Sequence, residues 1–279
     1  MNREACIPGS SLKGSIRTAI LNYLIRERPN FVKREKHLGR ERNGKMQYQD
    51  ARIQANYLAP SNGQNHRLDP QKDFLRLLHI GDAHFKTSTE LRKSMVINEY
   101  RNGWDEKKQL SSLFVCIPQG QKTHFSITIP EDLLRHTRAK KHLQVPENFP
   151  ALNLSKLLQV VNDHSLLLLK EEIEFWEEEE HPLVLEGYID YLQEIQEIAK
   201  AGTDGAAVLR VGAGTGWDFM TGGWPKRKDK YKEFLLEDRT WNDLKRSMRR
   251  GNYDPQTPFP KTRKLIQGGV PFGFIKIAL

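Results

Sequence analysis

Small residues and two basic side chains share the start of a predicted helix near the N-terminus. Ile7–Arg17 reads Ile-Pro-Gly-Ser-Ser-Leu-Lys-Gly-Ser-Ile-Arg. A helix opened by the Gly9–Ser11 turn offers free N–H groups and a dipole that favour an anion. Lys13 and Arg17 are four residues apart, so they lie on one helix face and can reach the same phosphate backbone. The stretch therefore predicts phosphate contacts, with an ordinary capped amphipathic helix as the alternative.

A P-loop nucleotide site is the obvious competitor for this turn, because Gly9 and Gly14 have the P-loop spacing. Lys13 precedes Gly14 here, whereas a P-loop places Lys-Ser/Thr after the second glycine. The lysine therefore cannot occupy the position that cradles phosphates, and a nucleotide-hydrolysing enzyme is disfavoured.

A second glycine-rich segment, Leu209–Trp217, follows a predicted strand. Its glycines alternate as Gly212-x-Gly214-x-Gly216, which is not the spacing of a dinucleotide-binding fingerprint. Glycine lets backbone approach a ligand closely, while Arg210 for phosphate and Trp217 for base stacking are typical of single-stranded RNA binding. The alternative is that these glycines allow tight packing against the first helix.

The charge of the chain also favours a polyanion as partner. Its 279 residues include 44 Lys plus Arg against 35 Asp plus Glu, a formal net charge of +9. Basic residues gather in Arg26–Lys45 and Lys226–Arg250, and acidic residues gather around Glu171–Glu174 and Glu177–Glu180. This separation predicts a surface for nucleic acid and a distinct acidic side that faces protein, with an ordinary solvated face as the alternative.

Composition excludes several other classes of protein. Apolar runs such as Leu166–Leu169 are far shorter than the roughly 20 residues of a membrane span, and the first residues lack the apolar core of a signal peptide. Cys6 and Cys116 are too few for a disulfide scaffold. We therefore expect a cytoplasmic, reduced protein without a membrane partner.

The hydrophobic periodicity predicts strands and helices that alternate irregularly, which favours an α+β fold. The expected helices are 9–27, 49–58 within a polar insertion, 152–180, 187–200 and 234–249. The expected strands are 94–99, 113–117, 123–129, 206–211 and 272–277, with 113–117 and 123–129 joined as a hairpin by a five-residue loop.

Four separated segments carry a resemblance to a known family. They are Ile7–Arg17, Asp73–Asp82 (Asp-Phe-Leu-Arg-Leu-Leu-His-Ile-Gly-Asp), Leu209–Trp217, and Pro260–Leu265 together with Pro271–Lys276. In this order they resemble the RAMP superfamily of CRISPR-associated proteins. The resemblance is greatest to the fifth subunit of type III-A Csm effector complexes, which caps the 3′ end of the crRNA. Gly81 departs from the pattern, because that family usually has Ser before the last Asp.

The resemblance implies a ferredoxin-like (RRM-like) RAMP fold with helical insertions. The first unit would span 1–150 with a basic insertion near 28–66, and 151–279 would hold a helical segment and a C-terminal RAMP unit. Because the Gly-Ser-Ser helix starts so early in this sequence, we expect the first unit to lack the family's opening strand, which leaves a sheet edge unfilled.

The resemblance also implies a non-catalytic subunit that binds the crRNA 3′ region, ends the filament of backbone subunits and recruits trimming nucleases. Its partners would be crRNA, target RNA and other subunits of the effector complex. A sister RAMP backbone subunit is an alternative. The residues predicted to contact RNA are Gly9, Ser10, Ser11, Lys13, Arg17, Arg210, Gly212, Gly214, Gly216 and Trp217.

Catalysis by a RAMP endoribonuclease that processes precursor crRNA is the main competing function. Such cleavage needs a general acid and base, for which His79, His84 and His124 are candidates, with Asp73 and Asp82 beside them. The spacing of these residues does not predict a metal or cofactor site. We expect His79 to be a core residue because of its apolar neighbours, and Asp82 to cap or hydrogen-bond a turn.

Overall fold

The protein is described from a computed structural model. The structure describes residues 4–28, 39–42, 45–48, 51–59, 69–100, 103–135, 145, 149–202, 205–221 and 260–279. The basic stretch Lys226–Arg250, which includes the predicted helix 234–249, and most side chains of Arg26–Lys45 lie outside these residues.

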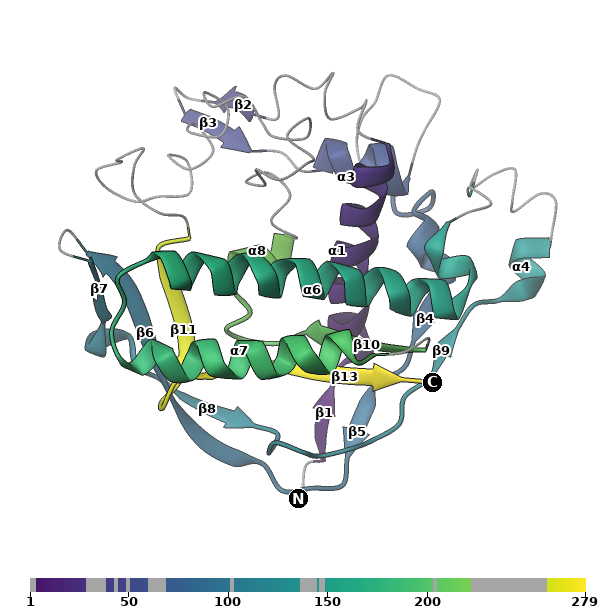
Figure 1. Cartoon of the computed structure of the whole chain (residues 1–279). Coiled ribbons are helices and arrows are strands. Elements are labelled where there is room, and N and C mark those ends of the chain that lie inside the picture. Colours follow the sequence, from purple (N-terminus) through teal and green to yellow (C-terminus); the bar gives the residue numbers. More distant parts are fainter. Residues whose placement is uncertain are drawn as a thin grey trace.

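Helix α1 (Gly9–Glu27) has the predicted bounds and stands near the centre of the molecule (Figure 1). Leu12, Ile16, Ile20 and Leu24 recur at helical spacing and are all buried. They pack into a core shared with α3 (Ala51–Leu58) and with the start of α6 (Leu154–Glu178). The predicted helical stripe is therefore the surface that anchors α1.

Helices α6 and α7 (Val184–Lys200) lie side by side across the strands β10 (Ala206–Arg210) and β13 (Phe274–Ala278) (Figure 1). Asn162 on α6 joins these layers. Its side chain donates to the carbonyl of Ala199 at 2.9 Å and accepts from the amide of Val208 at 3.0 Å. Both its donor and its acceptor are satisfied, as a buried amide requires. Both helices confirm the predictions for 152–180 and 187–200.

The largest sheet is built on β6 (Glu90–Tyr100), which pairs antiparallel with β7 (Gly103–Glu106), β8 (Leu113–Cys116) and β11 (Thr262–Ile266). Strand β12 (Val270–Pro271) extends this sheet from β11, while β10 and β13 pair with each other. Three small ribbons complete the described strands: β1 (Ala5–Ile7) with β5 (Ala83–Phe85), β2 (Gly39–Arg42) with β3 (Lys45–Tyr48), and β4 (His79–Ile80) with β9 (Ile127–Thr128). The short helices are α4 (Glu131–Arg135), α8 (Gly216–Thr221) and the 3₁₀ turns η1 (Phe74–Leu77), η2 (Lys108–Leu110) and η3 (Pro150–Leu152).

The α+β class is confirmed, but the predicted hairpin of 113–117 with 123–129 is wrong. Strand β8 pairs with β6, placing Val115 opposite Leu91, and the second segment is a strand only at β9, which pairs with β4. A pattern of β-forming residues indicates strands but not their partners, and the eleven-residue β6 competes successfully for β8. Ala5–Ile7 forms a short strand before α1, and the division near residue 150 stays a prediction.

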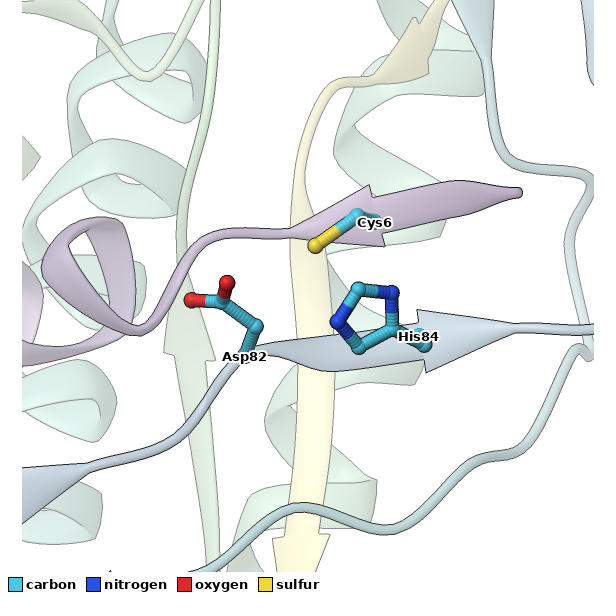
Figure 2. A group of neighbouring side chains, drawn as sticks. All are labelled: Cys6, Asp82 and His84. Carbon is cyan, nitrogen blue, oxygen red and sulfur yellow. The ribbon is translucent and has the colours of Figure 1, made fainter. Parts of the chain in front are cut away.

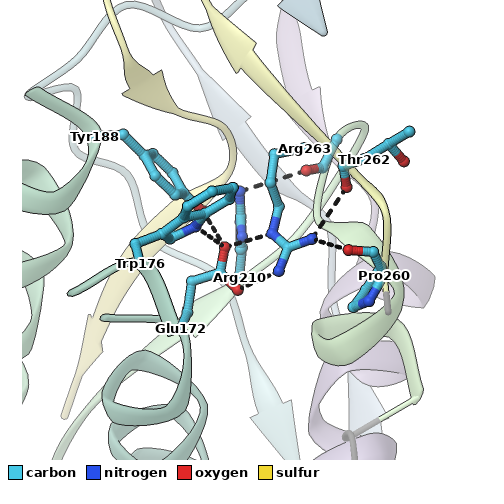
Figure 3. A network of polar contacts seen from close by, with 8 residues as sticks. Glu172, Trp176, Tyr188, Arg210, Pro260, Thr262 and Arg263 are labelled. Carbon is cyan, nitrogen blue, oxygen red and sulfur yellow. Dashed lines mark hydrogen bonds and ion pairs between the residues drawn. The ribbon is translucent and has the colours of Figure 1, made fainter. Parts of the chain in front are cut away.

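A second core lies around a buried ion pair between β11 and α6 (Figure 3). Arg263 donates to both carboxylate oxygens of Glu172, at 2.5 and 2.9 Å, and to the carbonyl of Pro260 at 2.7 Å. Glu172 belongs to the acidic stretch Glu171–Glu174, so this carboxylate is part of the core and not of an acidic surface. The helices that the structure describes include none with the length and apolar character to cross a membrane.

Candidate nucleic-acid interface

The two glycine segments meet at helix α1. Ser15 on α1 donates its hydroxyl to the carbonyl of Arg210 at 2.9 Å, and Thr18 donates to the carbonyl of Met220 on α8 at 3.3 Å. These bonds join residues that are 195 and 202 positions apart in the chain. The fold therefore places the Gly212–Gly216 loop and α8 beside the exposed side of α1.

The N-terminus of α1 is already held by a carboxylate of the protein. The amide of Gly9 donates to Asp82 Oδ1 at 2.7 Å, which confirms the capping role expected for Asp82. A Cβ at Gly9 would lie 2.1 Å from the carbonyl oxygen of Ile80, so only glycine fits there. The amide of Gly9 is thus used inside the protein, and its small size allows α1 to pack on β4, while its phosphate contact stays a prediction.

Lys13 and Arg17 lie on the same side of α1, but their surroundings differ. Arg17 Nη1 lies 2.5 Å from Asp73 Oδ2, and its other nitrogens lie 3.3 and 3.4 Å from Gln54 Oε1. Asp73 also accepts from the amide of Leu75 at the start of η1. Partial burial lowers the pKa of Lys13, with a partial offset from the charge of Asp73. A phosphate nearby would favour the charged form of Lys13.

Between this basic side and the glycine loop, α1 presents small residues. Ser10, Ser11 and Gly14 are exposed, and we call these three residues the α1 strip. A Cβ at Gly14 would have no heavy atom of another segment within 4 Å. Glycine within a helix costs about 1 kcal/mol relative to alanine. Packing within the described residues therefore gives no reason for Gly14 to be glycine.

Arg210 is buried, with 6% of its surface exposed. Its Nε donates to the carbonyl of Phe272 at 2.8 Å, and its guanidinium lies 4.9 and 4.7 Å from the ring centres of Phe219 and Phe274. The Arg210 side chain is therefore used inside the protein, and its phosphate contact stays a prediction. An arginine in a strand next to glycines does not reveal from the sequence which face of the strand it occupies.

The glycines of the second loop divide into two kinds. All three have positive φ, at 84°, 81° and 77° for Gly212, Gly214 and Gly216. A Cβ at Gly214 would lie 2.9 Å from the Phe272 ring, so the packing alternative applies there, although the neighbour is not the first helix. Gly212 and Gly216 are exposed with open space around them, and Trp217 is half-exposed at the start of α8. These three residues lie at the surface of the molecule, beside α1.

The histidines show a cluster that the sequence analysis missed. His79, His84 and His124 are all exposed, so the expectation of a core His79 is wrong. Cys6, Asp82 and His84 bring their ligand atoms within 4.8 Å of one another (Figure 2). Burial and the charge of Asp82 raise the pKa of the Cys6 thiol. Only the pairing of β1 with β5 unites these residues, because Cys6 is far from the others in sequence.

Comparison with known proteins now adds to this geometry. Neither a family model nor a curated protein matches the chain. Two solved structures share its fold. One is a chain of the cryo-EM structure of a Csm–crRNA–target RNA ternary complex in a type III-A CRISPR-Cas system: 20% identical, TM-score 0.65, covering 100% of this chain and 74% of that chain. The other is the crystal structure of T. onnurineus Csm5: 16% identical, TM-score 0.56, covering 99% and 72%. The protein therefore has the α+β fold of Csm subunits, which confirms the fold expected from the RAMP resemblance.

Proposed function

We propose that the protein is a non-catalytic RNA-binding subunit of a type III-A CRISPR effector ribonucleoprotein. In this role it binds the 3′ region of the crRNA, ends the filament of backbone subunits and leaves trimming to recruited nucleases. The observation that carries the proposal is the likeness of the whole chain to Csm5 and to a chain of a Csm–crRNA–target RNA complex. Its partners are then crRNA, the other subunits of the complex and target RNA.

The α1 strip is the surface where we place the RNA backbone. Lys13 borders it on one side, and Gly212, Gly216 and Trp217 lie toward the other, so charge, open backbone and an aromatic ring surround exposed small residues. Phosphate positioning by lysine, hydroxyls and backbone amides, together with base stacking on an aromatic ring, is a common way to bind single-stranded RNA. The exposed Gly14 supports this placement, because a close approach by RNA explains a glycine that packing does not.

The salt dependence of RNA binding tests this placement. We would measure the affinity of the purified chain for a labelled single-stranded RNA over a series of salt concentrations. Each phosphate contact on a single strand contributes about 0.7 to the slope of log affinity against log salt. Lys13→Ala should lower the slope by about that amount, while Lys200→Ala, an equal charge change on α7, should leave it unchanged. Equal slopes for wild type and Lys13→Ala would refute the placement of the RNA.

Three further measurements test the RNA placement and separate the competing functions. Gly14→Ala should weaken RNA binding although alanine favours the helix, because its methyl group would stand where the RNA approaches. Incubation of the same RNA without added metal tests the endoribonuclease alternative, and cleavage that is lost in His79→Ala would replace our proposal. Sequencing the RNA that co-purifies with the assembled complex tests the capping role, since a cap predicts a common crRNA 3′ boundary.

A further inference from the structure

The ribbon of β1 and β5 places three metal-binding side chains on one face. Its register sets Cys6 directly opposite His84. Because side chains alternate along a strand, Ala83 and Phe85 point into the core while His84 points outward. Asp82 precedes His84 by two residues, so it extends the same outward face of the ribbon. The grouping thus follows from strand pairing and not from an accident of one side-chain rotamer.

The donor atoms of these residues are close to the spacing that a metal ion requires. The Cys6 sulfur, an Asp82 oxygen and a His84 ring nitrogen lie within 4.8 Å of one another, and the side chains converge in Figure 2. Donors around a tetrahedral zinc ion are about 3.5 Å apart, given metal–ligand distances of about 2.0–2.3 Å. Small side-chain rotations would close the remaining gap.

The neighbours of Asp82 and His84 leave one donor atom of each side chain available. Asp82 Oδ1 accepts from the amide of Gly9 at 2.7 Å, which leaves Oδ2 for a metal. His84 Nδ1 lies 3.9 Å from Glu4 Oε2, which leaves the opposite ring nitrogen, Nε2, toward Cys6 and Asp82. A carboxylate that faces the second nitrogen of a histidine ligand is a common feature of zinc sites, because it orients the ring and raises its basicity.

We propose that Cys6, Asp82 and His84 form a zinc-binding site. One sulfur, one nitrogen and one oxygen donor suit zinc, whereas magnesium and calcium prefer oxygen donors alone. Three protein ligands leave a fourth position for water. The ion would fasten β1 to β5 directly before α1 and thereby hold the start of the α1 strip, since Asp82 also holds the amide of Gly9.

Cobalt substitution is the sharpest test, because cobalt reports a sulfur ligand by its absorption. The full chain would be stripped with a chelator under a phosphine reductant and titrated with Co²⁺ alone. We expect one cobalt per chain, a thiolate-to-cobalt charge-transfer band and displacement by Zn²⁺. Cys6→Ser should abolish the band and weaken zinc binding at least about tenfold. Cys116→Ser, which changes the other cysteine of the chain, is the matched control and should behave as wild type.

A second pair of variants keeps the test decisive if Cys6→Ser folds poorly. His84→Gln should weaken zinc binding, whereas His124→Gln, also an exposed histidine, should not. A saturating excess of zinc should raise the Tm of wild type by roughly 5 °C and leave that of His84→Gln unchanged. Absence of the sulfur band in wild type, or equal zinc affinity in both histidine variants, would overturn the proposal. RNA binding by the α1 strip is measured separately, so either proposal can fail alone.

Discussion

Two arginine–carboxylate pairs of this protein have the same contact distance in different surroundings. Arg263 with Glu172 and Arg17 with Asp73 both meet at 2.5 Å. The side chains of the first pair are 9% and 8% exposed, and those of the second are 23% and 14% exposed. The first pair fixes β11 against α6, whereas the second lies at the edge of the surface proposed to bind RNA. The buried pair thus stabilises the fold, whereas the surface pair keeps Arg17 at a place where an RNA phosphate can replace Asp73 as its partner.

Two further side chains donate hydrogen bonds to Glu172 of the buried pair. Glu172 also accepts from the indole of Trp176 at 2.9 Å and from the hydroxyl of Tyr188 at 3.2 Å (Figure 3). Burial by itself would lower the pKa of Arg263, but the charge and hydrogen bonds of Glu172 raise it well above its usual value. Burial and the charge of Glu172 likewise raise the pKa of Tyr188. Arg263 therefore stays charged and Tyr188 stays neutral at neutral pH.

Removing one partner of the buried pair should have the largest effect. Arg263→Met leaves the Glu172 carboxylate buried without its cation, which should lower the free energy of unfolding by about 3–5 kcal/mol. Urea denaturation at neutral pH measures this loss. Arg92→Met is the matched control, because Arg92 pairs with Glu90 at 2.7 Å but its side chain is 50% exposed, so we expect a far smaller loss of stability.

The double variant Glu172→Gln with Arg263→Met distinguishes a costly orphaned charge from a generally fragile core. Removing both charges should restore much of the stability lost in Arg263→Met, because no unpaired ion stays buried. A double variant that is less stable than the single one would contradict this account of the network.

The surface pair should respond less in stability and more in binding. Asp73→Asn removes the partner of Arg17, which should cost about 1 kcal/mol or less and should cost less still at high salt. The same change frees the positive charge of Arg17 beside the α1 strip and should strengthen RNA binding. Glu131→Gln on α4 removes the same charge from an exposed pair with Arg135 and serves as the control. Unchanged RNA affinity in Asp73→Asn would show that Arg17 and RNA do not meet.

The contrast between the pairs also shows what the sequence could predict. The helical stripe of α1 is visible in the spacing of Leu12, Ile16 and Ile20, because burial of one helix face repeats with the helical period. Arg210 next to a glycine-rich loop indicates a phosphate contact, and Glu172 within a run of glutamates indicates an acidic surface, yet tertiary partners make both of them core residues. The meeting of Cys6 with His84 depends on strand register, which local sequence patterns do not specify.

Lys13 offers the smallest but most discriminating prediction. Its pKa in the folded protein is lowered from 10.5 by partial burial, so folding disfavours its charged form. At neutral pH this penalty is present in full, and it disappears as the pH rises through the folded pKa toward 10.5, where the unfolded chain also loses its proton. Lys13→Met should therefore raise the Tm at neutral pH by about 1 °C, and the gain should vanish at high pH.

The same substitution should weaken RNA binding, because an RNA phosphate would lose the positive charge of Lys13 as its partner. Opposite signs for stability and binding are expected of a residue kept for its partner and not for the fold. Thermal melts from neutral to alkaline pH, with RNA titrations at neutral pH, measure the two effects on one protein sample. If Lys13→Met lowered the Tm at neutral pH, Lys13 would stabilise α1 itself. Its role would then be structural, like that of the buried pair of Arg263 with Glu172, and not that of an RNA-binding residue.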